Sequence, residues 1–344
     1  MFSTLIVYHR YRLNNPSLYK FSNSATITIV QRAVEKFSSP RLAINSSQSN
    51  PDLYTVQPYP FLVADETHGY RMKAGEFTFT IRKQFNEGWK QFRYTAKVLP
   101  NQSRWLGRID PVKSNSQKVL IFGDSFVFGE GVNDEQTFSF LLQQKYPHLD
   151  IQSFATNGYS LLNTLFSLKK IGSQLSSKDV ILIGYADYFD VRHVAAPSRI
   201  RAYGEPRSQI QDVSIKLPGA MLNSDGSLRF FKVPIFCKFA GNYCSNPDPN
   251  KVYMTSVTQR IIQEIAETTK AKVILLHFWG SRDDKALTKI PNNIDLLSAT
   301  LDDFDYEIRD DILGFDFHPG PFWHYAMFQH ISDYFLNQGI ANEN

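Results

Sequence analysis

The chain has 344 residues, of which 42% are apolar and 20% charged, and a formal net charge of +4. This length suits one large domain with an annex. The small net charge, without a stripe of Lys and Arg, argues against a nucleic-acid partner, and no run approaches the roughly 20 apolar residues of a transmembrane segment.

Residues 1–115 show no regular alternation of strands and helices. Polar and apolar residues alternate at 76–81 and again at 90–99, which predicts antiparallel strands with a hairpin across 86–89. We interpret 1–115 as an N-terminal α+β annex. The opening residues 1–15 have no basic region before their apolar patch and no small-residue cleavage site after it, so no signal peptide is predicted. The chain as it stands is then cytoplasmic, or exported if an N-terminal segment was removed.

From residue 116 to 344 the pattern changes to strands that alternate with helices. Runs rich in Val, Ile and Leu predict strands that are apolar on both faces, which is typical of a parallel sheet covered on both sides. We therefore expect a three-layer α/β/α domain, with an irregular insertion at about 192–251 that forms a lid or substrate loop. The predicted strands are 118–124, 150–156, 179–186, 271–279 and 293–301, and the predicted helices are 134–146, 160–175, 255–269 and 321–336, with Asn133 or Asp134 capping the first.

Cys237 and Cys244 lie close together in the insertion. They could close a small disulfide loop in an oxidising compartment, or remain two partly buried thiols in a reduced cytosol. We expect a bridge only in exported protein.

The first strand of the α/β region ends on Gly123, Asp124 and Ser125, and a glycine-rich turn follows. In an open parallel sheet, ligands bind at the carboxyl ends of the strands. Ser125 should lie there with its hydroxyl exposed and with free backbone N–H groups beside it. A serine needs a base to become a nucleophile, and without one Ser125 is an ordinary turn or capping residue.

A candidate base comes from the far end of the chain, where Asp316 stands two residues before His318 and Pro319 follows directly. Proline disfavours the helical region for the residue before it, so His318 should be extended. Residues two apart in an extended segment point the same way. Asp316 could then orient the His318 imidazole, as a Ser-His-Asp triad requires.

The stretches IFGDSFVFGEGV and DFHP resemble the SGNH, or GDSL, hydrolase superfamily over about residues 116–338. The resemblance implies a flavodoxin-like fold, with Ser125 as nucleophile, His318 as base and Asp316 as its orienter. It also implies that the N–H groups of Ser125 and Gly158 form the oxyanion hole, since Gly158 follows the second strand in SFATNGYS.

The third block of the resemblance is where the chain departs from the pattern. The family expects Gly-x-Asn-Asp after the third strand, with the Asn side chain as an oxyanion donor. Here Gly184 and Asp187 align, but Ala186 stands at the Asn position. One lost donor could cost roughly a hundredfold in rate. Nearby hydroxyl or amide groups could substitute, namely those of Asn157, Tyr185 and Tyr188.

Other polar residues near the strand ends are candidates for the cleft wall: Asp124, Asp187, Arg192 and His193. No metal or cofactor is predicted. The histidines of the α/β region are too irregularly spaced for a metal site, and no Gly-Lys-Ser/Thr follows the glycine-rich turn to make a phosphate loop.

The sequence favours a serine ester hydrolase that works through an acyl-enzyme on an O-acylated carbohydrate or a small ester. Two alternatives remain. The acyl group could pass to a sugar hydroxyl, as in a polysaccharide O-acyltransferase. The chain could also be a non-catalytic binding protein, for which Ala186 is the support. Acyl chain length and oligomeric state are not predicted.

Overall fold

The computed structural model describes residues 53–85, 88–108, 115–203, 212–279, 284–299 and 318–341. Asp316 lies outside these ranges, as do residues 1–52, 86–87 and 109–114 of the predicted annex. Within the described ranges, no helix is both long and apolar enough to cross a membrane.

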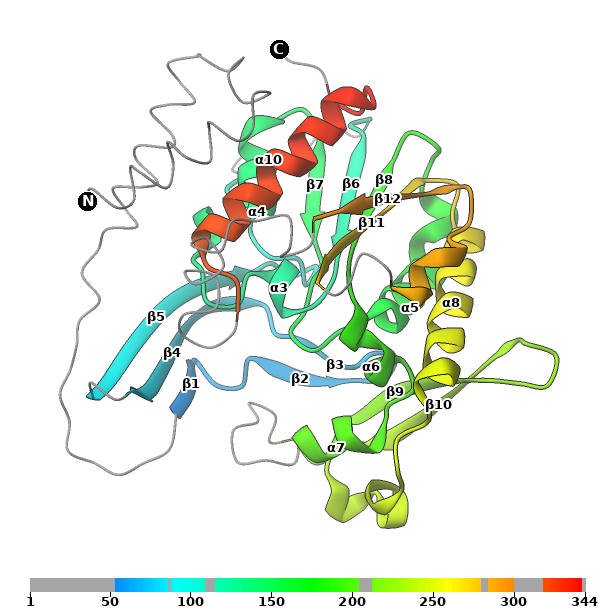
Figure 1. Ribbon diagram of the computed structural model, residues 1–344. Helices are drawn as coiled ribbons and strands as arrows, with labels where there is room; N and C mark the ends of the chain where they lie inside the picture. The colour runs from blue at the N-terminus through cyan, green and yellow to red at the C-terminus, as the bar shows by residue number, and fades with distance from the viewer. Residues whose placement is uncertain are drawn as a thin grey trace.

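A five-stranded parallel sheet forms the centre of the molecule (Figure 1). Its strands run in the order β12-β11-β8-β6-β7, which is the flavodoxin-like order 2-1-3-4-5 when they are counted along the α/β region. The central strands are almost wholly buried, as their runs of Val, Ile and Leu predict. The strands are β6 (Lys118–Phe122), β7 (Asp150–Ser153), β8 (Val180–Ala186), β11 (Lys272–Trp279) and β12 (Ile294–Ser298).

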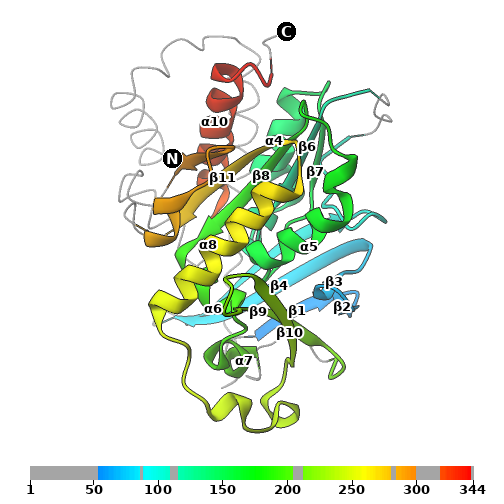
Figure 2. The ribbon, with the colours of Figure 1, turned by 90° about the vertical axis from the view of Figure 1, so that its right-hand side faces the viewer.

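Helices cover both faces of this sheet. On one face α4 (Phe138–Lys145) packs with α10 (Pro321–Asn337), and on the other α5 (Leu161–Ile171) packs with α8 (Lys251–Thr268). Figure 2 shows α5 and α8 in front of the sheet, with α4 and α10 behind it. The predicted three-layer α/β/α fold is confirmed.

The helix predicted at 134–146 is divided in two. Asp134–Gln136 form a 3₁₀ turn, and α4 begins after Thr137, whose hydroxyl accepts a hydrogen bond from the N–H of Phe140 at 3.2 Å. Thr137 is therefore the cap of α4, and Asn133 caps only the short turn before it. The helix expected at 255–269 begins earlier than predicted, because Asn250 provides its cap.

The annex contains the predicted strands. β1 (Leu53–Gln57), β4 (Gly75–Phe85) and β5 (Gly88–Val98) form an antiparallel sheet, and β2 (Leu62–Asp65) pairs with β3 (Gly69–Met72). The hairpin between β4 and β5 falls where the sequence predicts it. Arg104 pairs by its backbone with both Val98 and Ser153, which joins the annex sheet to the edge strand β7. Annex and α/β region share one hydrophobic core.

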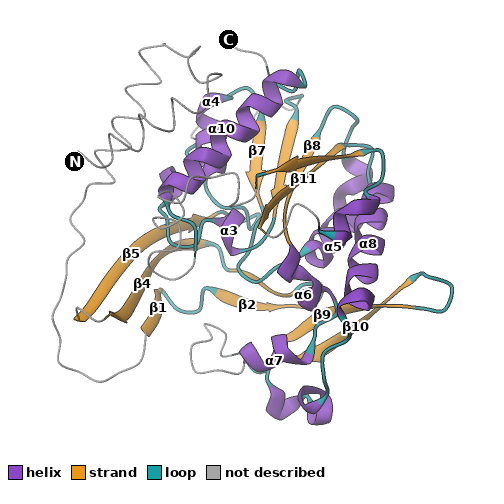
Figure 3. Cartoon of the chain, viewed as in Figure 1, coloured by secondary structure: helices purple, strands orange, loops and turns teal. Residues whose placement is uncertain are grey.

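The insertion is more regular than predicted. It contains the short helices α6 (Asp190–His193) and α7 (Pro197–Tyr203), and a hairpin of β9 (Lys216–Leu222) and β10 (Leu228–Pro234) (Figure 3). A disulfide links Cys237 to Cys244. Strand β9 contacts β3 of the annex and also α5, so the insertion meets the annex below the carboxyl edge of the parallel sheet.

Candidate active site at the carboxyl edge of the sheet

Ser125 opens α3 (Ser125–Phe128), a single helical turn that follows β6 directly. This helix can approach the sheet because two glycines lie beneath it, Gly123 just after β6 and Gly184 within β8. A Cβ on Gly123 would lie 2.4 Å from the Val127 side chain, and a Cβ on Gly184 would lie 2.2 Å from it. Both glycines therefore make room for Val127, and Val127 anchors α3 over the ends of β6 and β8.

The hydroxyl and the N–H of Ser125 donate to no group in the described ranges, although its carbonyl accepts the N–H groups of Gly129 and Glu130. Ser125 is only 6% exposed, whereas the sequence predicts an exposed hydroxyl. These groups are the ones a nucleophile and an oxyanion donor must keep available.

Asp124 caps α3 and links it to the insertion. Its fully buried carboxylate accepts hydrogen bonds from the N–H of Phe126 at 2.9 Å, the hydroxyl of Tyr188 at 2.7 Å and the guanidinium of Arg192 at 3.1 Å. Burial and the adjoining Asp124 carboxylate raise the pKa of the Tyr188 hydroxyl well above its usual range. Asp124 therefore holds α3 in place rather than facing a substrate.

His318 comes to this turn from the loop before α10. Its ring lies 5.5 Å from the Phe126 ring, centroid to centroid, and its Nε2 lies 3.4 Å from Oε2 of Glu130. No hydrogen bond joins His318 to Ser125 in the described part of the chain. The structure thus brings the predicted base to the helix of the predicted nucleophile, with its ring turned toward a carboxylate. Catalytic hydrogen bonds are often long or misaligned until substrate binds.

Glu130 was not singled out from the sequence. It stands between the two glycines of the turn, where a charged residue is ordinarily solvated, yet it is only 6% exposed. Its Oε2 also accepts the Asn157 amide at 2.6 Å. The flanking glycines, Gly129 and Gly131, both have left-handed backbone angles that let the turn bend inward. A carboxylate inside such a tight turn was the signal available in the sequence.

The loop after β7 carries the predicted oxyanion donors. Its Thr156 N–H donates to the carbonyl of Gly123 at 3.1 Å, so this loop adjoins the end of β6. Gly158 has a φ of 79°, and its N–H donates to no described group. The Asn157 carbonyl accepts the Tyr70 hydroxyl at 2.7 Å, and Asn157 Oδ1 is buried with no hydrogen-bond partner in the described structure.

The other two substitute donors are already engaged. The buried Tyr185 hydroxyl donates to Asp284 at 2.8 Å, and the Tyr188 hydroxyl donates to Asp124. Ala186 is fully buried at the end of β8. Among the three side chains predicted to replace the family's Asn, only Asn157 has a further hydrogen to donate in the described structure. One hydrogen of its amide goes to Glu130, and the second is not used.

The predicted cleft residues separate into two groups. His193 is fully buried against α8, its Nδ1 lies 2.7 Å from the Thr258 hydroxyl, and burial lowers its pKa to about 3. It does not face a cleft. Asp187 is half-buried, and burial together with the nearby Asp284 carboxylate raises its pKa. Arg192 does line a pocket, beside Gly158.

That pocket lies where annex, α/β region and insertion meet. The annex contributes His68 and Tyr70, the loop after β7 contributes Gly158 and Tyr159, and the insertion contributes two arginines and β9. The pocket is small, with a volume of about 20 Å³, which is room for a water-sized group. The described residues contain no group of three or more His, Cys, Asp or Glu side chains placed to hold a metal ion.

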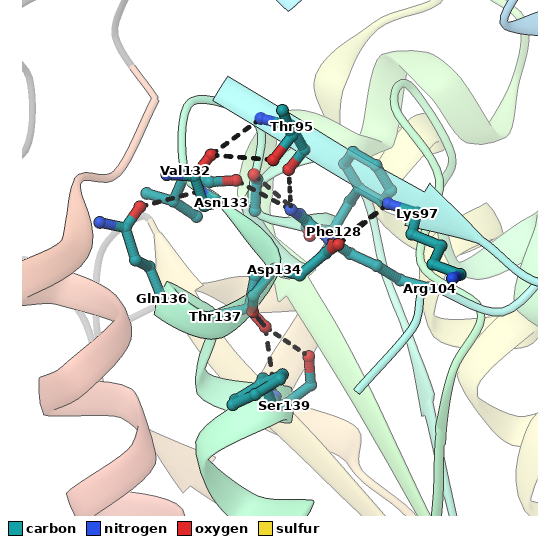
Figure 4. Close-up of polar contacts among 12 residues, drawn as sticks. Thr95, Lys97, Arg104, Phe128, Val132, Asn133, Asp134, Gln136, Thr137 and Ser139 are labelled. Carbon is teal, nitrogen blue, oxygen red and sulfur yellow. Dashed lines mark hydrogen bonds and ion pairs between the residues drawn. The ribbon is translucent and has the colours of Figure 1, made fainter. Parts of the chain in front are cut away.

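Arg104 fixes the turn that follows α3 (Figure 4). Its guanidinium is buried, stacks 4.5 Å from the Phe128 ring centroid, and donates to the carbonyls of Phe128, Gly129 and Val132 as well as to Asp134. A buried charge is tolerated only when its donors are satisfied in this way. Arg104 comes from the annex, so the annex helps to set the backbone of the candidate site.

No protein-family model matches the sequence, and no curated protein matches it. Solved structures do resemble it. A member of the lipolytic G-D-S-L family from Veillonella parvula DSM 2008 shares 12% identity at a TM-score of 0.37, and the match covers 64% of this chain and 98% of that one. A family two carbohydrate esterase from Clostridium thermocellum, solved in complex with cellohexaose, shares 10% identity at 0.39, covering 74% and 77%.

A third similar structure is the salicylyl-acyltransferase SsfX3 from a tetracycline biosynthetic pathway, at 10% identity and a TM-score of 0.34, covering 74% of this chain and 63% of that one. These proteins include the family that the sequence motifs resemble. The likeness is remote at these values, so the chemistry of this site has to come from its own residues.

Proposed function

We propose that this protein is a GDSL-type serine ester hydrolase that works through an acyl-enzyme. Ser125 is the nucleophile, His318 the base and Asp316 the group that orients His318. The N–H groups of Ser125 and Gly158 hold the oxyanion. The observation that carries the proposal is the meeting of Ser125, with its hydroxyl and N–H free of described partners, and His318 at one turn on the carboxyl edge of the sheet.

The steps follow from these positions. His318 takes the proton of the Ser125 hydroxyl as Oγ attacks the ester carbonyl, and the carbonyl oxygen becomes an oxyanion held by backbone N–H groups. Collapse of this intermediate expels the alcohol, which leaves with the proton from His318. Water then attacks the acyl-enzyme with His318 again as base, and the carboxylic acid departs as Ser125 recovers its proton.

We propose an O-acylated carbohydrate or a small ester as the substrate, the class that the sequence favours. Tyrosine rings, the Asn163 amide and Arg192 line the pocket beside Gly158, whose volume of about 20 Å³ has room for a water-sized group and not for a whole substrate. If a sugar hydroxyl replaces water in the second step, the same residues perform acyl transfer.

A non-catalytic binding protein is the second candidate, and a specific observation favours it. Ala186 places a buried methyl group where the family has a donor, and the Tyr185 and Tyr188 hydroxyls are bound elsewhere. A hole with one donor fewer stabilises the transition state less, by roughly 3–4 kcal/mol for a well-placed donor.

The experiment that separates the two is covalent trapping. The protein is incubated with a serine-directed fluorophosphonate and its intact mass is measured, with Ser125→Ala and heat-unfolded protein as controls. We expect one adduct on the native protein and none on either control. A native protein that stays unlabelled at millimolar reagent, and hydrolyses p-nitrophenyl acetate no faster than Ser125→Ala, belongs to the binding class.

A further inference from the structure

We propose that Glu130 is a positioning residue of this site, which holds both the base and the oxyanion loop through one buried carboxylate. The inference rests on the proposed function, because it gives Glu130 a part in that reaction. Glu130 is only 6% exposed, and side chains from two distant parts of the chain contact its carboxylate. They are Asn157 after β7 and His318 before α10.

The Asn157 contact is the shorter of the two. Its Nδ2 donates to Oε2 of Glu130 at 2.6 Å, while its Oδ1 is buried with no hydrogen-bond partner in the described structure. The hydrogen bond to Glu130 therefore fixes the orientation of the Asn157 side-chain amide. Because Asn157 directly precedes Gly158, the same bond restrains the peptide that would present the Gly158 N–H to an oxyanion.

Tyr54 brings the annex close to this carboxylate. It lies near enough to Glu130 for the charge to affect its pKa, and its hydroxyl lies 2.8 Å from the Tyr94 hydroxyl of β5. Burial and the Glu130 charge together raise the pKa of Tyr54 well above its usual range, so the tyrosine remains a neutral donor. The hydrogen bond that Glu130 accepts from Asn157 offsets part of the cost of burying this carboxylate.

The His318 contact gives the carboxylate its effect on the reaction. When His318 takes the proton of Ser125 its ring becomes positively charged, and Oε2 of Glu130, 3.4 Å from Nε2, lowers the energy of that ion. The ring of Phe126 covers another side of the imidazole and carries no charge. Asp316 is the second carboxylate proposed for His318, so the test has to separate the two acids.

The test reads His318 directly and needs no turnover. Ring ¹⁵N signals of uniformly labelled protein are followed against pH by long-range correlation NMR, in the Ser125→Ala background, with His318→Asn to assign them. Glu130→Gln keeps the size and an acceptor for Asn157 but removes the charge. We expect the midpoint of the His318 titration to move lower by about one pH unit, because the charge that stabilises the protonated ring is gone. Glu130→Asp keeps a carboxylate and should bring the midpoint part of the way back.

Matched variants complete the design. Tyr54→Phe removes a hydroxyl near Glu130 but leaves the charge, so it should move the midpoint much less. Asp316→Asn measures the other acid separately. In the Ser125 protein, Glu130→Gln should lower kcat with little change in KM. Each variant is first shown to melt cooperatively by circular dichroism, and Glu130→Asp replaces Glu130→Gln as the reporter if the latter does not fold.

The outcomes are distinct. A folded Glu130→Gln protein whose His318 midpoint coincides with that of the unchanged protein overturns the inference. If the midpoint moves but the unchanged protein takes no fluorophosphonate, the pairing of Glu130 with His318 stands and the esterase function fails.

Discussion

Arg104 donates a 2.6 Å hydrogen bond from Nε to the carboxylate of Asp134, and both side chains are buried. Arg104 belongs to the annex, whereas Asp134 follows the turn after the candidate nucleophile. The Asp134 carboxylate also accepts the backbone N–H of Lys97 at 3.0 Å, on β5. The pair therefore joins the annex sheet to the segment that follows α3, in which Glu130 lies.

Replacing Arg104 should disorder the turn after α3 and lower the stability of the whole fold. Arg104→Met keeps the length of the side chain but leaves Asp134 and several carbonyls buried without donors, which should lower the free energy of unfolding by about 3–5 kcal/mol. Urea unfolding measures this. Glu76→Gln is the matched control, because it removes the exposed pair of Glu76 with Lys97 and should cost under about 1 kcal/mol. Equal losses in the two variants would contradict this role for Arg104.

Buried histidines should make the protein sensitive to acid. Burial lowers the pKa of His324 to about 3, far below the value of about 6.5 in an unfolded chain. Below about pH 6.5 the unfolded chain binds a proton that the folded protein does not, so stability is present above that pH and is lost as the pH falls. From pH 7.5 to pH 5 this amounts to about 2 kcal/mol for one histidine.

His324→Gln tests this by removing one titrating group. The difference in unfolding free energy between the original protein and His324→Gln should change by about 2 kcal/mol over that pH range, to the advantage of the variant at low pH. The exposed His148, replaced in the same way, is the control. Identical pH dependence in all three proteins would mean that His324 is protonated in the folded state.

The disulfide should contribute measurable stability. A bridge closing the short loop between Cys237 and Cys244 stabilises by about 2.5 kcal/mol in the chain-entropy treatment. Reduction should lower the unfolding midpoint, whereas a Cys237→Ser, Cys244→Ser double variant should not respond to reductant. Protein made in an oxidising compartment should show no free thiol after unfolding without reductant, and two thiols in native material would exclude the bridge.

The oxyanion donors can be ranked by activity on p-nitrophenyl acetate. Tyr188→Phe removes a hydroxyl that already serves Asp124, so it should lower kcat less than about tenfold. Asn157→Ala removes the one substitute that keeps a spare amide hydrogen, and should cost about a hundredfold or more. A larger loss in Tyr188→Phe than in Asn157→Ala would make the tyrosine the donor.

Ala186→Asn asks whether the hole is complete. The new amide should raise a weak activity if the donor is missing, and leave it unchanged if Asn157 already acts there. Because Ala186 is fully buried, the larger side chain could overpack the end of β8. Ala186→Leu, of similar size without a donor, controls for that effect.

Local patterns in the sequence were enough to predict the central architecture. Strands buried on both faces read as apolar runs, and their alternation with helices leads to a parallel sheet with Ser125 at its carboxyl edge. The hairpin of β4 and β5 followed from alternation and a turn signal in the same way. These features depend on residues that are neighbours along the chain, so the sequence is sufficient to predict them.

The roles of individual polar residues were decided only by tertiary packing. Asn133 and Thr137 are equally good caps in sequence, and the 3₁₀ turn between them selects Thr137 for α4. His193 looked like a cleft residue because it follows a strand end, but helix α6 turns it into the interface with α8. The local sequence pattern does not predict the rotation of α6 that places His193 there.

Sequence patterns alone were sufficient to predict the α/β sheet and the position of Ser125 at its carboxyl edge. The folded structure was needed to show that Arg104 of the annex donates to the turn in which Glu130 lies. Each is a lone charge in its own stretch of sequence, where a solvated side chain is the ordinary outcome. Burying either charge is favourable only when partners from distant segments arrive together, and those partners are known once the chain has folded.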